Sequence, residues 1–145
     1  LLASAGSVRP GQLAELIAKP FRARKPGEPD VDYVARAIAE PIRRSHKTHD
    51  AASAEAAYIV VYDGGVYSMD GTFGVYRSSH GYNAVGFGDP YALGSLATSE
   101  ALPPRERIEA ALAAAAKHCT SVCGPMHVTF VPALEKRVPK KVHPQ

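Results

Sequence analysis

Four residues of the kinds that bind zinc lie close together near the end of the chain: His118, Cys119, Cys123 and His127. Thiolate and imidazole groups are common ligands of tetrahedral zinc. The spacing is loose, however, and the run crosses an expected helix end, a turn and a strand, so nothing brings the four side chains to one point. Two small cysteines buried beside a turn are the commoner outcome of such a pattern. We therefore predict no metal site here.

A cysteine near a histidine can also form a nucleophile and its general base. Nothing in the sequence indicates that Cys119 or Cys123 is activated as a thiolate, and no third residue that would orient the histidine is identifiable. His46 and His49 lie in a polar stretch, and we expect both to be solvated. The residues alone therefore give no complete catalytic set.

The glycines at positions 64, 71, 86 and 88 raise the question of a phosphate-binding loop. Gly86-x-Gly88 lacks the third glycine of a dinucleotide-binding fingerprint, and no Lys-Ser or Lys-Thr pair follows it as in a P-loop. Turn formation explains these glycines better. We expect no cofactor.

The composition is that of one globular domain. The chain has 145 residues, of which 46% are hydrophobic and 21% are charged. No stretch approaches the roughly 20 apolar residues of a membrane span, and no signal peptide is recognisable. The net charge of +3 is too small to indicate nucleic-acid binding, and two cysteines favour a reducing compartment. The sequence thus predicts a cytoplasmic domain with neither a membrane nor a nucleic-acid partner.

The first half of the chain predicts a strand followed by two helices. Leu1 to Gly6 is short and apolar and ends in small residues, as a buried strand does. Because Leu1 and not a methionine opens this strand, we expect further residues before it in the parent protein. A helix is predicted from Arg9 to Pro20, and a second helix is predicted to be capped by Asp30 and to end or kink at Pro41. Its buried face should hold Val31, Val34, Ala35, Ile38 and Ile42.

The second half predicts strands and then two more helices. Two β-branched runs joined by Asp63-Gly64-Gly65 indicate a β-hairpin. A looser hairpin or loop is expected over 70–83 and a short strand at 84–85. Helices follow at about 90–99 and from Pro104, the second with Ile108, Ala111, Leu112 and Ala115 at helical spacing. A last strand is expected over 126–131. Strands and helices grouped in this way favour an α+β fold.

Three segments in this order resemble the family of proteasome β-subunits and the bacterial HslV peptidase. Leu1 to Gly6 resembles the family strand that ends in a glycine beside the active site. Val85 to Leu96, with Gly86-Phe87-Gly88 and Tyr91-Ala92-Leu93-Gly94, is similar to the family's Gly-Ser-Gly segment and the helix that follows it. Pro104 to Pro125 is similar to the next family helix and its glycine turn.

This resemblance implies the αββα four-layer sandwich of the N-terminal nucleophile hydrolases, with its first strands missing from this chain. Residues 1–131 would form the proteasome-like domain, and residues 132–145 a basic, proline-bearing tail. The implied activity is that of a threonine-type endopeptidase, in which an N-terminal threonine attacks the peptide carbonyl and its own α-amine moves the proton. That threonine would precede Leu1.

The resemblance also implies roles for a few residues of this chain. Gly6 matches the glycine whose backbone N–H helps to form the oxyanion hole and pairs with the substrate backbone. Ser7, Val8 and Arg9 would lie near the mouth of the substrate pocket, with Gly6, Ser7 and Arg9 as substrate-binding residues. Phe87 stands where the family has a serine that hydrogen-bonds the threonine amine, and a phenylalanine cannot make that bond.

The family assembles into homo-oligomeric rings, which implies further copies of this chain as partners. An ATP-dependent unfoldase and an unfolded protein or peptide substrate complete the expected set. Phe87, together with Thr120 and His118 where the family has an aspartate, keeps a second interpretation open, a non-catalytic structural subunit of the same fold. A third is an unrelated α+β binding domain whose glycine and alanine content produces the likeness.

Overall fold

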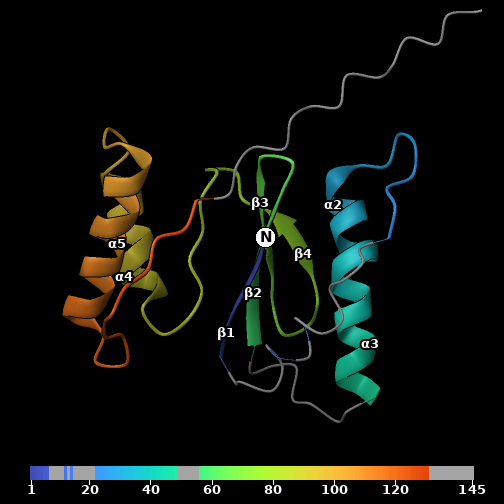
Figure 1. Ribbon diagram of the computed structural model, residues 1–145, viewed down its shortest axis with the longest axis horizontal. Helices are drawn as coiled ribbons and strands as arrows, with labels where there is room; N and C mark the ends of the chain where they lie inside the picture. The colour runs from blue at the N-terminus through green and yellow to red at the C-terminus, as the bar shows by residue number, and fades with distance from the viewer. Residues whose placement is uncertain (7–11, 13, 15–21, 49–55, 131–145) are drawn as a thin grey trace, which may run out of the picture.

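A computed structural model describes residues 1–6, 12, 14, 22–48 and 56–130 (Figure 1). Its centre is a four-stranded antiparallel sheet in the order β1-β2-β3-β4, so that β1 and β4 form its edges. The strands are β1 (Leu2–Gly6), β2 (Ala56–Tyr62), β3 (Gly65–Met69) and β4 (Val75–Arg77). Of the first expected helix only Gln12 and Ala14 are described, and both are helical.

The hairpin between β2 and β3 confirms the strongest local signal in the sequence. Asp63 and Gly64 have φ values of 45° and 74°, and two successive left-handed residues form the turn whose twist suits a hairpin. Gly65 then pairs with Tyr62. A Cβ on Gly65 would lie 2.7 Å from the ring of Tyr67, so this glycine makes room for a buried aromatic side chain. The looser second hairpin also forms, because β4 pairs with β3.

The helix over residues 30–48 differs from the prediction at Pro41. It is continuous through α2 (Asp30–Val34), a π-helical turn (Ala35–Ala39) and α3 (Glu40–Thr48). Pro41 has no N–H to donate and its ring crowds the preceding turn of an α-helix. The wider π turn lies directly before it, where the Glu40 N–H donates to the carbonyl of Ala35. The helix therefore passes through the proline, and the expectation that it ends there is wrong.

The predicted N-cap of this helix is also wrong. Pro29 holds the N-cap position without a side-chain hydrogen bond, and Asp30 is the first helical residue. The Asp30 carboxylate instead accepts from Arg24 at 2.7 Å. An acidic group in the first turn still favours the helix through its dipole.

One face of the helix and one face of the sheet form the main core. Val34, Ile38 and Ile42 are buried as predicted, while Val31 and Ala35 are partly exposed. The sheet contributes the buried side chains of Tyr58, Val60, Tyr67 and Met69.

His46, which the sequence predicts to be solvated, belongs to this core. Its side chain is 2% exposed, its Nε2 lies 3.2 Å from the Tyr58 hydroxyl, and its ring meets the edge of Phe73. The reason is helical spacing: His46 lies four residues after Ile42 and so shares its inward face. His49 lies outside the described residues.

The helices α4 (Asp89–Thr98) and α5 (Pro104–His118) form a pair on the other side of the sheet from α2 and α3 (Figure 1). They meet through small side chains and one leucine: Ala92, Leu96, Ala111 and Ala115. Both helices begin within one or two residues of their predicted positions. Ile108, expected in the buried face of α5, is 39% exposed, because the close approach of α4 is made at the alanines.

Two predicted strands do not form. Residues 84–85 and 126–130 have no strand structure, and Val131 lies outside the described residues. A strand needs a neighbour for its backbone hydrogen bonds, and the described part of the chain offers neither segment one. The described residues thus form a mixed α/β fold with one sheet. None of its helices is long and apolar enough to span a membrane.

An ion pair holds the connector before α2 against that helix. Arg36 donates from Nε and a terminal nitrogen to the two carboxylate oxygens of Glu28, at 2.6 and 2.7 Å. This bidentate contact, together with the N–H of Lys25, lowers the pKa of Glu28 to about 2. A carboxylate whose pKa falls on folding stabilises the native state above its ordinary pKa of 4.5 and loses that contribution as the pH drops toward 2.

We therefore expect Glu28→Gln to unfold at lower urea concentration than the parent near neutral pH, with the difference narrowing steadily below pH 4.5. Glu109→Gln is the matched control, because Glu109 and its partner Arg105 are 49% and 65% exposed and such pairs contribute little. A difference for Glu28→Gln that does not change with pH would show that the ion pair is not its cause.

Candidate functional site

A cavity of about 520 Å³ lies where the end of β1, the start of β2 and the loop before α4 come together. Gly6 and Phe87, which the sequence singles out, both line it although they are far apart in the chain. Its remaining walls are Ala5, Ala56, Ala57, Asp70, Gly71, Gly86 and Asp89. The structure thus brings together the two described residues of the predicted site. Ser7, Val8 and Arg9 lie outside the described residues.

Two glycines allow the backbone to shape this cavity. Gly6 and Gly86 have φ values of 109° and 113°, a conformation that residues with a Cβ adopt at a cost. A Cβ on Gly86 would also lie 3.4 Å from the Cβ of Ala5. The loop before α4 can therefore lie directly against the end of β1. This contact places the backbone of Gly6 beside Phe87.

Two carboxylates line the cavity, and sequence reasoning missed both. Oδ1 of Asp70 accepts from the backbone N–H and the hydroxyl of Thr72, at 2.8 and 2.6 Å, and these bonds lower the pKa of Asp70. Asp89 opens α4, and its N–H donates to the carbonyl of Gly86. In the sequence, Asp70 follows a strand and Asp89 begins a helix, so each has the pattern of an ordinary turn or helix-start residue. Their shared cavity depends on the pairing of β1, β2 and β3, which the local sequence does not reveal.

Phe87 lies at the cavity with 84% of its surface exposed. Such exposure is unusual for a large apolar side chain beside a pocket, and it marks a contact surface for another group more often than a core position. The side chain offers no hydroxyl and no hydrogen-bond donor. Among the described residues that line the cavity, polar contacts can come from the backbone and from the carboxylates of Asp70 and Asp89.

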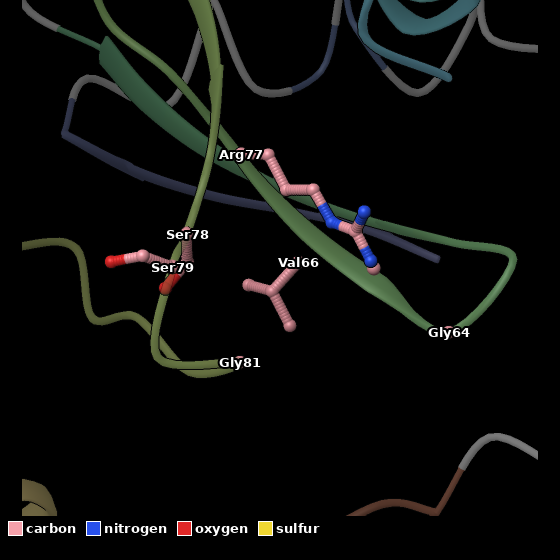
Figure 2. Close-up of a pocket in the computed structure, with 7 residues that line it drawn as sticks. Gly64, Val66, Arg77, Ser78, Ser79 and Gly81 are labelled. Atoms are coloured by element: carbon pink, nitrogen blue, oxygen red, sulfur yellow. The ribbon is translucent and has the colours of Figure 1, made fainter. Parts of the chain in front are cut away.

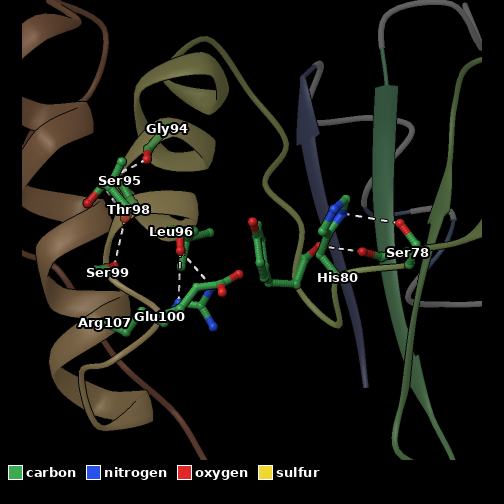
Figure 3. Close-up of polar contacts among 11 residues, drawn as sticks. Ser78, His80, Gly94, Ser95, Leu96, Thr98, Ser99, Glu100 and Arg107 are labelled. Carbon is green, nitrogen blue, oxygen red and sulfur yellow. Dashed lines mark hydrogen bonds and ion pairs between the residues drawn. The ribbon is translucent and has the colours of Figure 1, made fainter.

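The segment that leads to Phe87 crosses the sheet and is fixed by side chains at both sides (Figure 3). Ser78 donates its hydroxyl to the carbonyl of Tyr82 at 2.6 Å, and the amide of Asn83 donates to the hydroxyl of Ser68 on β3. From α5, Arg107 lies over the ring of Tyr82 at 4.5 Å and donates twice to the carbonyl of Leu96, at 3.0 and 2.6 Å.

The cysteine and histidine run does not assemble a site. Within the described ranges, no group of three or more His, Cys, Asp or Glu residues is arranged to hold a metal ion. His118 stacks on Tyr91, Cys119 is half-buried and Cys123 is exposed. The expectation that both cysteines are buried is therefore wrong: Cys119 ends α5 and is partly exposed, and Cys123 lies beyond the turn that follows.

The fold and the cavity define a mixed α/β domain with a site at the end of an edge strand. No protein-family model matches the chain, and no curated protein matches it. Solved structures do. Thiobacillus denitrificans BPH superposes with a TM-score of 0.64 at 19% identity, over 86% of this chain and 70% of that chain. Thiobacillus denitrificans BPH in complex with epoxomicin superposes equally well at 20% identity, with the same coverage. At these identities the likeness shows a shared fold.

Replacing Gly86 and Gly94 with alanine should change the stability of the protein in opposite directions. Gly86→Ala should destabilise the protein by about 1–2 kcal/mol, because it forces a Cβ into a left-handed conformation. Gly94→Ala should stabilise it by about 0.5–1 kcal/mol, because Gly94 lies inside α4 with open space around it. Urea unfolding of both variants measures these changes. A neutral Gly86→Ala would mean that the loop does not need its close approach to β1.

Proposed function

We propose that this protein is a proteasome-like peptidase subunit of the N-terminal nucleophile type. The observation that carries the proposal is the cavity that joins Gly6 at the end of β1 to the Gly86-Phe87-Gly88 segment before α4. These are two of the three segments in which the sequence resembles the family. The shared fold with BPH supports the proposal, and so does the complex of BPH with epoxomicin, a proteasome inhibitor.

In this proposal the nucleophile is the N-terminal residue of a segment that precedes Leu1. Its hydroxyl attacks the substrate carbonyl, and its α-amine accepts the proton, since an α-amine titrates near neutral pH. The backbone N–H of Gly6 stabilises the resulting oxyanion. The charged side chains among the cavity walls, Asp70 and Asp89, are both acidic and suit a protonated amine in this space.

The same segment would complete the fold. Residues 84–85 belong to no strand of the described chain, and Asn83 beside them is bonded to β3 through Ser68. Strands that precede residue 1 would pair with this region and form a second sheet between the first sheet and the α4–α5 pair. That arrangement is the four-layer sandwich. We further propose that the subunit assembles into a cytoplasmic homo-oligomeric ring, supplied with unfolded protein by an ATP-dependent unfoldase.

Phe87 favours a second candidate, a non-catalytic subunit of the same fold. Its side chain cannot replace the hydroxyl of the family serine, and it is almost fully exposed at the cavity. A subunit without chemistry would keep the cavity as a binding or assembly surface. The two candidates differ in whether the mature protein has a nucleophile.

The deciding experiment is the intact mass and N-terminal sequence of the protein purified from its source, followed by hydrolysis of a fluorogenic peptide. The peptidase requires a mature N-terminal Thr, Ser or Cys, activity that is lost when this residue is replaced by Ala, and a covalent epoxomicin adduct seen by mass. An assembled native protein without such an N-terminus, or one with equal activity after the replacement, would overturn the proposal.

Position 87 gives a second test within the described chain. If the cavity is catalytic, Phe87→Ser should raise the rate of peptide hydrolysis by about tenfold, since a hydroxyl there can bond the charged amine of the nucleophile. Phe87→Ala is the matched control, because it removes the ring without adding a hydroxyl. Equal rates for the Ser and Ala variants would exclude this role for position 87.

A further inference from the structure

A second cavity, of about 310 Å³, lies at the opposite end of β2 from the candidate site (Figure 2). It is bounded by the β2–β3 turn at Gly64 and Gly65, by Val66, and by the end of β4 with the loop that follows it, from Arg77 to Gly81. Ala56, at the other end of β2, belongs to the first cavity. The seven residues of β2 separate the two cavities by roughly 20 Å.

The walls of this second cavity carry one charge, and it is positive. Arg77 is the last residue of β4, and Ser78 and Ser79 follow it. In Figure 2 the guanidinium of Arg77 and the hydroxyl of Ser79 lie on opposite sides of Val66. No carboxylate lines the cavity, and within the described residues Arg77 forms no ion pair. A guanidinium left without a carboxylate partner is free to bind an external anion.

The remaining walls are small and leave space beside this charge. Gly64 and Gly81 have left-handed backbones, and a Cβ on either would meet no atom within 4 Å. Ser79 contributes a hydroxyl whose oxygen lies 3.1 Å from Nδ1 of the exposed His80. The hydroxyl of Ser78 is already donated to Tyr82, so its contribution is to fix the loop. A planar guanidinium, an exposed hydroxyl and an open, glycine-bounded space are the elements of a carboxylate or phosphate site.

We propose that this cavity binds the oxyanion of a small molecule, a carboxylate or a phosphate, with Arg77 as the principal ligand and Ser79 as a hydroxyl donor. The site is independent of the peptidase proposal, because it lies at the other end of the sheet and shares no residue with the first cavity. Val66 supplies an apolar floor for the part of the ligand that carries the anionic group.

Asp63 provides a sharp probe of this site. It does not line the cavity, but it directly precedes Gly64, which does, and a carboxylate so close in the chain should disfavour a bound anion. Asparagine adopts the left-handed conformation of this turn readily, and Asn-Gly is a preferred hairpin turn. Asp63→Asn therefore removes the charge while it keeps the fold.

The experiment is titration of the full-length protein with inorganic phosphate and, separately, with acetate, followed by NMR shifts or calorimetry at constant ionic strength set with sodium chloride. We expect saturable binding by at least one of the two anions, and the stronger of them identifies the ligand class. Arg77→Gln should weaken that binding by about tenfold or more, and Asp63→Asn should strengthen it by about twofold to fivefold. Arg105→Gln, an exposed arginine on α5, is the matched control and should change nothing.

Three results would overturn the site. If sodium chloride at the same ionic strength produced the same NMR shifts as phosphate or acetate, the anions would be acting on the charged surface as a whole. Unchanged binding in Arg77→Gln, checked to be folded by its circular dichroism, would exclude the arginine. If Arg105→Gln weakened anion binding as much as Arg77→Gln, the loss would be explained by the lower net charge of the protein.

Discussion

The side chain of Arg107 joins three parts of the molecule: α5, the end of α4 and the segment that crosses the sheet. It reaches from α5 to the C-terminal end of α4 through the Leu96 carbonyl, and its guanidinium covers the ring of Tyr82 in the segment that crosses the sheet. A helix C-terminus carries partial negative charge, and an aromatic face attracts a cation. The positive guanidinium of Arg107 therefore interacts favourably with both groups. The side chain is 20% exposed, and water therefore screens these contacts only in part.

The candidate site depends on this connection. Gly86, Phe87 and Asp89 lie between Tyr82 and the body of α4, so their position relative to Gly6 follows from how the crossing segment and the helix pair are held. The cavity itself is formed mostly by backbone and by alanines, with left-handed glycines on both sides. Its shape is thus a property of the chain path, while Asp70 and Asp89 determine its charge.

Local patterns predicted the elements well, and contacts between distant residues explain the failures. Asp-Gly-Gly between β-branched runs was enough to predict the β2–β3 hairpin, and the helices after Pro90 and Pro104 follow from their starts and spacing. The burial of His46 required knowledge that Tyr58 and Phe73 face the same side of α3. Residues 84–85 have strand-like side chains but no neighbouring strand in the described chain. The resemblance of Gly6 and Phe87 to family positions brought together two residues that composition alone would not have linked.

The π-helical turn at Ala35–Ala39 also has a bearing on the ancestry of the helix. Such a turn holds one residue more than an α-helical turn, and each residue in a helix advances the chain by about 100°. It can be regarded as a one-residue insertion that the fold has absorbed without losing its core. The residues of α3 after this turn therefore face the sheet as they would in a regular helix that is one residue shorter. Removing one residue there would restore a regular α-helix and leave Ile42 and His46 on the face toward the sheet, so this turn can lose its extra residue without any change in the later core residues.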